Sequence, residues 1–143
     1  MFKTILVPID LDQKTSWQKA LPIAVDFARK EGATLHMMTV IPDMAMTLVA
    51  QYIPEGYPEK LTAESQVGLE TLAREHVPQG VAAKVHVRHG SIYRGILDLA
   101  EDLGADLIVM GSHKPELMDY LIGPNAAYVV RHADCSVMVV RGE

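Results

Sequence analysis

The stretch Ile5-Leu6-Val7-Pro8-Ile9-Asp10 is a run of apolar residues that ends in a carboxylate. Such an uninterrupted run is typical of a strand in a parallel sheet that helices cover on both faces. The stretch Leu107-Ile108-Val109-Met110, followed by Gly111, has the same character. We therefore predict two buried parallel strands, after which the chain turns at Asp10 and at Gly111.

The rest of the chain alternates between predicted helices and strands. Further strands are predicted at residues 34–41, 82–87 and 137–140, and further helices at residues 61–76, 91–104 and 124–132. A first helix is predicted to begin at the capping box Thr15-Ser16-Trp17-Gln18 and to stop at Gly32, which places Pro22 in its second turn. Residues 42–57 and 111–123 are predicted loops, the first of them a long crossover with one helical turn.

This alternation predicts an α/β fold with a five-stranded, parallel, doubly wound sheet and helices on both faces. We expect the flavodoxin-like strand order 3-2-1-4-5 and a single domain over residues 1–143. In sheets of this kind, ligands bind beyond the carboxyl ends of the strands, where the strand order reverses. The predicted site therefore lies between Asp10 and Gly111.

The composition excludes several classes of protein. A chain of 143 residues, 49% hydrophobic and 22% charged, is ordinary for a globular domain that folds without disulfides or metals. The net charge of -5 argues against a nucleic-acid partner, and no apolar run is long enough for a membrane span or a signal peptide. We expect a cytoplasmic protein in which the single cysteine, Cys135, is a partly buried filler. His86 and His89 should point to opposite faces of a strand, so no metal site is predicted.

Two polar features lie where the ligand is expected. Asp10 can accept a hydrogen bond from a ribose hydroxyl or help to hold a hydrated cation, but a carboxylate here can equally cap the following loop. Gly111-Ser112-His113-Lys114 and Gly123-Pro124-Asn125 can form an anion cradle, with the dipole of a helix that begins at Pro124 and the charge of Lys114. The glycines can also serve only to turn the chain.

Three segments of the chain resemble the universal stress protein (UspA) family. Leu6-Val7-Pro8-Ile9-Asp10 resembles the opening strand of these proteins, and the segment 105–112 resembles their fourth strand with the turn after it. The segment 130–141 is similar to their last helix and strand. The resemblance covers the whole chain in order and implies the adenine nucleotide alpha hydrolase-like fold, which agrees with the strand order predicted above.

The glycine motif of the family is present with two departures. The ATP-binding members carry glycine, two residues, glycine, nine residues, glycine, and then serine or threonine. Here the spacing from Gly111 to Gly123 is preserved, Lys114 takes the middle glycine position as in the UspF/UspG-like branch, and Pro124 takes the serine position. Because proline lacks a backbone donor and a hydroxyl, we expect a weaker grip on phosphate, or a preference for nucleotides with fewer phosphates.

The resemblance implies ATP or AMP as the ligand, with or without Mg²⁺. The implied nucleotide-binding residues are Pro8, Ile9, Asp10, Val40, Met110, Gly111, His113, Lys114, Gly123, Pro124, Asn125 and Ala126. Of these, Val40 would meet the adenine and the residues from Gly123 onward would face the phosphates. The resemblance also implies a homodimer formed through Val137–Val140, and a protein partner that the sequence does not identify.

Three functions remain open at this stage. The first is a dimeric, nucleotide-binding sensor or adaptor in a stress response, which is not an enzyme and needs no general base. The second is a nucleotide-free interaction module of the same family. The third is a slow ATP hydrolase that would use Asp10, a cation and His113.

Overall fold

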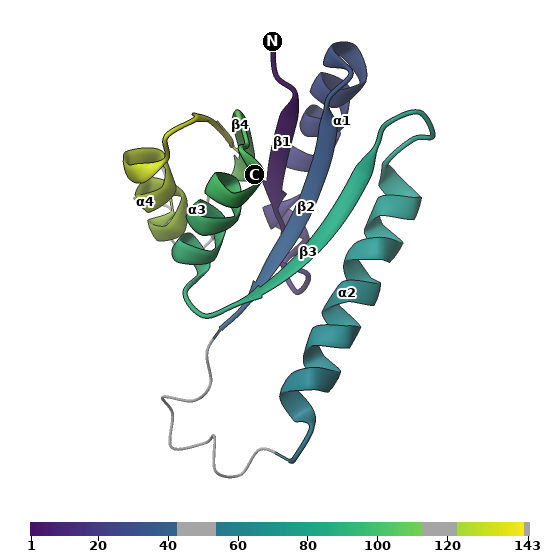
Figure 1. Cartoon of the computed structure of the whole chain (residues 1–143), viewed down its shortest axis with the longest axis vertical. Helices are drawn as coiled ribbons and strands as arrows, with labels where there is room; N and C mark the ends of the chain where they lie inside the picture. The colour runs from purple at the N-terminus through teal and green to yellow at the C-terminus, as the bar shows by residue number, and fades with distance from the viewer. Residues whose placement is uncertain (43–53, 113–122, 142–143) are drawn as a thin grey trace.

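The computed structural model describes residues 1–42, 54–112 and 123–141, and these form an open parallel sheet. The strands are β1 (Thr4–Pro8), β2 (Thr34–Ile41), β3 (Ala83–His89), β4 (Leu107–Gly111) and β5 (Ser136–Val140). They pair in the order β3-β2-β1-β4-β5 (Figure 1), which confirms the predicted topology. Most of the predicted crossover, residues 43–53, lies outside the described residues, and so does the loop 113–122.

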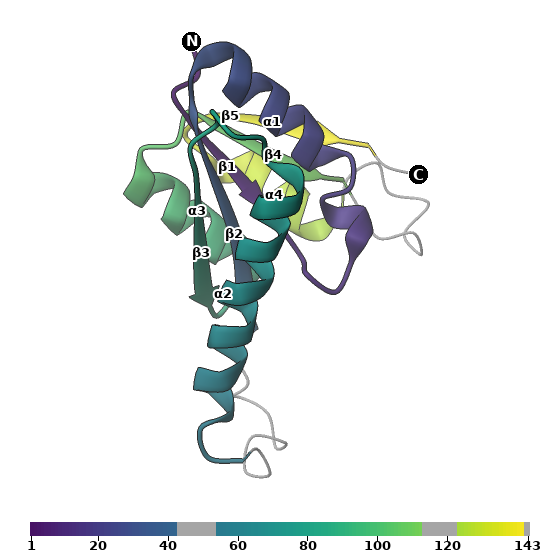
Figure 2. The same cartoon turned by 90° about the vertical axis from the view of Figure 1, so that its right-hand side faces the viewer.

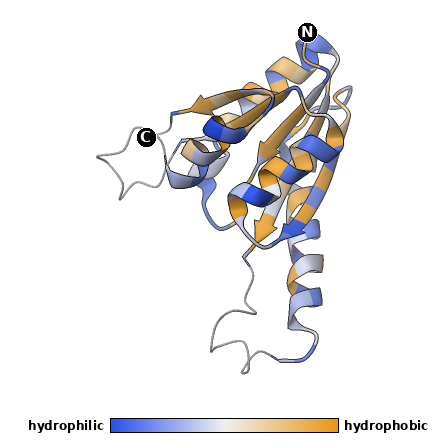
Figure 3. Ribbon diagram, turned by 60° about the vertical axis from the view of Figure 1, so that its left-hand side comes forward, coloured by the Kyte–Doolittle hydropathy of each residue, from blue (hydrophilic) through white to orange (hydrophobic). Residues whose placement is uncertain are grey.

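Helices cover both faces of the sheet. Helices α1 (Ala20–Glu31) and α2 (Tyr57–His76) pack on one face, and α3 (Ile92–Leu103) and α4 (Pro124–His132) pack on the other (Figures 1 and 2). Figure 3 shows the strands as largely apolar ribbons and the outward parts of the helices as polar. Among the described residues, no helix is both long and apolar enough to cross a membrane.

Successive side chains of β1 belong to two different hydrophobic clusters, one on each face of the sheet. Ile5 and Val7 belong to the cluster under α1 and α2, whereas Leu6 belongs to the cluster under α3 and α4. All three side chains are fully buried. Because successive side chains of a strand point to opposite faces, a central strand that is covered twice must be apolar at every position. The first run in the sequence is therefore explained by the position of β1 in the middle of the sheet.

The predicted start of the first helix is wrong. Thr15 and Ser16 of the capping box lie in a short 3-10 helix, η1 (Lys14–Ser16), and α1 begins only at Ala20. Pro22 consequently lies in the first turn of α1 and not in the second, a position where the missing N–H has no helical partner to lose. Thr15, which would be the cap residue of this box, lies inside η1, and the hydroxyl of the neighbouring Ser16 is bonded to the backbone of Asp10. The predicted stop at Gly32 is correct, with φ at 67°.

Two histidines that the sequence patterns did not connect meet between β2 and β3. His36 Nδ1 lies 2.8 Å from His86 Nε2, and the two rings are stacked with centroids 5.1 Å apart. Burial lowers the pKa of both side chains, and the positive charge of Lys84 adds to this effect. The pair is therefore most stable when its two rings are neutral and share one hydrogen bond.

Acid is expected to destabilise the fold through this histidine pair. Since the pKa of each ring is lower in the folded chain than in the unfolded chain, the unfolded state binds more protons as pH falls below about 6.5. The free energy of unfolding should fall between pH 7.5 and 5.5, as measured by denaturant titration. The variant His86→Gln keeps a polar group near His36 but cannot be protonated, so its loss should be smaller. An equal loss in both proteins would contradict the assignment.

Candidate functional site

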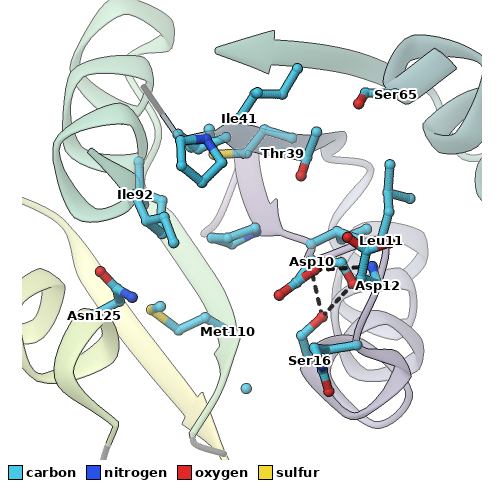
Figure 4. Close-up of a pocket in the computed structure, with 18 of the residues that line it drawn as sticks. Asp10, Leu11, Asp12, Ser16, Thr39, Ile41, Ser65, Ile92, Met110 and Asn125 are labelled. Carbon is cyan, nitrogen blue, oxygen red and sulfur yellow. Dashed lines mark hydrogen bonds between the residues drawn. The ribbon is translucent and has the colours of Figure 1, made fainter. Parts of the chain in front are cut away.

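A cavity of about 710 Å³ opens at the carboxyl ends of β1, β2 and β4 (Figure 4). It lies where the strand order reverses between β1 and β4, and its volume falls within the range of about 300–1,000 Å³ common for ligand sites. The structure brings these predicted site residues together in its lining: Pro8, Ile9, Asp10, Val40, Met110, Gly111, Gly123, Pro124, Asn125 and Ala126. The other two, His113 and Lys114, lie outside the described residues.

The loop after β1 holds Asp10 in a fixed position. The Asp10 N–H donates to Ser16 Oγ at 3.0 Å, and the Ser16 hydroxyl donates back to the Asp10 carbonyl at 3.2 Å. The Asp12 N–H donates to Asp10 Oδ1 at 3.0 Å, which closes a turn through the side chain. The Asp10 carboxylate thus uses one oxygen to stabilise its own loop and has further acceptor capacity toward the cavity.

Gly111 is required because another part of the backbone approaches it closely. A Cβ atom at this position would lie 2.8 Å from the carbonyl oxygen of Ser16, closer than such atoms are found in proteins. The φ angle of Gly111 is not positive, so the turn alone does not need glycine. The end of β4 therefore packs against the same Ser16 that is hydrogen-bonded to Asp10. A displacement of Gly111 is expected to be passed to Asp10 through Ser16.

The N-terminus of α4 faces the cavity and offers backbone donors. The Gly123 N–H is bonded to the Ser112 carbonyl at 2.5 Å, and Pro124 has no N–H. Helix geometry leaves the N–H groups of Asn125 and Ala126 without an intrahelical acceptor. Together with the positive end of the helix dipole, these two donors make this end of the cavity suitable for an anion.

The side chains of the lining are apolar or acidic. Pro8, Val40, Ile92 and Met110 form apolar walls on the α3 and α4 side of the sheet. The carboxylates in the lining are Asp10, Asp12 and Glu64. Among the lining residues that the structure describes there is no lysine, arginine or histidine. For the described part of the cavity, positive potential therefore comes only from the N-terminus of α4.

Sequence reasoning missed the contribution of α2. Leu61, Ser65 and Gly68 line the cavity together with Thr39 at the end of β2. Leu61, Ser65 and Gly68 are spaced four and three residues apart, so they lie on one face of the helix. A serine and a glycine within an inward-facing helical stripe were the available signal, but nothing in the sequence says which strand end that stripe meets.

The histidine and cysteine predictions can now be placed. His86 contacts His36, whereas His89 Nε2 lies 2.8 Å from Thr62 Oγ1 on α2, so the two rings do face different neighbours. Burial raises the pKa of the half-buried Cys135 thiol, which lowers the fraction of reactive thiolate. Both features agree with structural roles for these side chains.

The fold and the cavity define a doubly wound α/β protein with a ligand-sized site at its switch point. The model of the universal stress protein family matches residues 1–141, and the chain belongs to that family. It is 34% identical to universal stress protein G of Escherichia coli O157:H7, over 99% of this chain and 100% of that protein. The predicted family and its UspG-like branch are thereby confirmed.

Solved structures share the same architecture. Universal stress protein UspA from Lactobacillus plantarum is 28% identical and superposes with a TM-score of 0.74, covering 98% of both chains. A universal stress protein in complex with cAMP has a TM-score of 0.65 at 20% identity, covering 99% of this chain and 98% of that one. The universal stress protein from Archaeoglobus fulgidus in complex with dAMP has a TM-score of 0.60 at 18% identity, covering 96% and 97%.

Proposed function

We propose that this chain binds an adenine nucleotide in the cavity and acts by binding it, not by turning it over. The observation that carries the proposal is the order of groups along the cavity. In Figure 4, Asn125 at the start of α4 lies at one end, and Asp10 lies between Asn125 and Ser65 of α2. Pro8 and Val40 add apolar surface to the lining of the same cavity. The N-terminus of α4 would hold the phosphate, Asp10 would hold the ribose, and the apolar residues would contact the base. Proteins of the same fold that carry cAMP and dAMP support the assignment.

The charge of the lining favours one phosphate over three. Asp10, Asp12 and Glu64 all line the cavity, and no cationic side chain offsets them among the described lining residues. Pro124 removes one donor from the anion end. Mg²⁺ would have to neutralise part of the charge of ATP near these carboxylates. We therefore expect AMP to bind more tightly than ATP when magnesium is absent, and the difference to shrink when it is present.

The experiment that tests the proposal begins with the purified protein. Small molecules released by denaturation are identified by mass spectrometry, and calorimetric titrations with ATP, ADP and AMP follow, with and without Mg²⁺. The proposal expects a purine nucleotide that is released or binds with micromolar affinity, and no phosphate release when ATP is incubated with the protein. Phosphate release that depends on Asp10 would favour the slow hydrolase instead.

A nucleotide-free interaction module is the second candidate. It is favoured by two observations, the proline at the first position of α4 and the acidic lining without a described cation. If no nucleotide binds at millimolar concentration, this candidate replaces the first. Both candidates place the protein in a stress response through contacts with another protein.

We also propose that the chain forms a homodimer through β5, which is the edge strand of the sheet. Val137, Met138, Val139 and Val140 are only half-buried in the single chain. A long apolar edge with unpaired N–H groups promotes pairing with another strand, and an isologous pair closes the assembly.

Replacing Val139 with proline should dissociate this dimer without unfolding the chain. The Val140 carbonyl accepts from the Ser112 N–H next to β4, so the backbone groups of Val139, one residue earlier, point to the open edge. Proline at such an edge position removes an N–H that only a partner strand would use. Light scattering should report a monomer with unchanged circular dichroism, whereas Met138→Pro should lower the melting temperature. A Val139→Pro dimer would exclude this interface.

A further inference from the structure

Helix α3 forms part of the cavity wall beside the end of β2. Ile92 and Ile96 of this helix line the cavity, and so does Val40 of β2; Ile92 is labelled in Figure 4. Gly95 lies between the two isoleucines in the chain and does not line the cavity itself, but it contacts Val40, which does. Gly95 is therefore expected to act on a ligand through Val40.

Gly95 is a glycine for reasons of space and not of backbone conformation. Its φ angle is not positive, and its N–H donates to the Ser91 carbonyl at 2.9 Å, as in any helix. With this backbone, alanine would favour the helix more than glycine does. A Cβ at this position, however, would lie 2.8 Å from Val40 Cγ2 and 3.4 Å from Val40 Cγ1. The two methyl groups of Val40 thus occupy the space that any larger residue would need.

The helix is less free to move than the valine side chain. Ile96 and Leu99 of α3 are almost fully buried in the core on this face of the sheet. Arg88 Nη2 of β3 also lies 3.1 Å from Asp102 Oδ2 near the end of α3. Moving α3 away from the sheet would expose buried apolar surface, whereas Val40 only has to turn to another staggered rotamer. A side chain at position 95 would therefore displace Val40 and not the helix.

The cavity is the open side of Val40. On one side β3 flanks this residue, where Val40 pairs with Arg88. On the other side β1 ends at Pro8, which pairs with Met38, so β1 does not extend beside Val40. Val40 borders the cavity at this point. A methyl group that is displaced from α3 would consequently turn into the cavity.

We propose that Gly95 is a positioning residue of the site: it lets Val40 pack against α3 and so keeps the cavity open at the end of β2. The width of the cavity at this wall is then set by a residue that the ligand does not touch. For the ligand, this inference rests on the proposed function, because AMP is the probe that would meet the displaced methyl group. The position of Val40 itself can be measured without nucleotide.

Gly95→Ala should weaken AMP binding by about 10- to 100-fold in a calorimetric titration, because a valine methyl group and the nucleotide would compete for the same space. The melting temperature of the nucleotide-free variant should not fall, since the methyl group can turn into an empty cavity and alanine favours the helix. Asp98→Ala is the matched control. It introduces the same residue at an exposed position of α3 outside the cavity lining and should leave AMP affinity unchanged.

The variant Val40→Ala separates positioning from a general structural effect. It removes both methyl groups that a Cβ at position 95 would meet, so Gly95→Ala should cause no further loss of AMP affinity in a chain that already carries Val40→Ala. A merely structural role of Gly95 would give the same loss in both backgrounds. In the nucleotide-free protein, three-bond NMR couplings of the Val40 methyl groups should report a changed χ1 angle in Gly95→Ala.

The possible outcomes separate the two proposals. If Gly95→Ala binds AMP as tightly as the native chain, or if its loss persists in the Val40→Ala background, the inference is wrong and nucleotide binding stands. A lower melting temperature with an unchanged χ1 angle of Val40 would show that α3 moves instead, and would also overturn the inference. If the native chain binds no nucleotide but the χ1 angle changes as expected, the proposed function is wrong and the positioning of Val40 by Gly95 stands.

Discussion

Replacing Gly111 with alanine is expected to lower the free energy of unfolding by about 1–3 kcal/mol and to weaken nucleotide binding in the same variant. The added Cβ would lie 2.8 Å from the Ser16 carbonyl oxygen, so one of these two backbone segments must shift. Ser16 also holds the Asp10 backbone through two hydrogen bonds. The displacement should therefore reach the carboxylate that we expect to meet the ribose.

Denaturant titration and calorimetry with AMP check this prediction. Gly68→Ala is the matched control for stability, since its Cβ would meet only the flexible end of the Leu11 side chain, at 3.2 Å. Alanine also favours the helix there by about 0.5–1 kcal/mol, so this control should be close to neutral in stability. Stability of Gly111→Ala equal to that of the native chain would mean that the contact between β4 and η1 is looser than described.

Replacing Pro124 with serine is expected to lower the dissociation constant of phosphorylated nucleotides by about 10- to 100-fold. Pro124 is the first residue of α4 and lines the cavity beside Asn125. Serine would add a backbone N–H and a hydroxyl to an end that now has two free backbone donors, those of Asn125 and Ala126. A hydrogen bond to a charged group contributes about 1.5–3 kcal/mol, and each 1.4 kcal/mol is tenfold in affinity.

The variant Pro124→Ala separates the two added groups, because it restores the N–H without the hydroxyl. Titration with adenosine is the internal control, since a ligand without phosphate should bind all three proteins equally. If Pro124→Ser left AMP and ATP binding unchanged while adenosine bound, the phosphate would lie elsewhere than at α4. Equal tightening for adenosine would instead indicate a general change in the cavity.

Local sequence patterns were sufficient for most of the fold. The apolar run at Ile5–Ile9 must be a central strand because only a strand covered on both faces is apolar at every position. Gly32 and Gly104 end α1 and α3 with positive φ angles, as their places after the helical stripes indicated. The start of α1 was mispredicted because Thr15 and Ser16 form η1 instead, where the Ser16 hydroxyl is bonded to the backbone of Asp10, and a capping pattern carries no information about that competing structure.

By itself, the sequence determined the parallel sheet, the order of its strands, and the position of a cavity between Asp10 and Gly111, since these depend on periodicity and on the general behaviour of α/β sheets. Only the tertiary structure decided what else lines the cavity and why Gly111 is a glycine. Thr39 and Ser65 line one cavity because α2 packs against β2, and the Ser16 carbonyl approaches Gly111 because η1 packs against β4. Such contacts join residues far apart in the chain, and no local pattern encodes them.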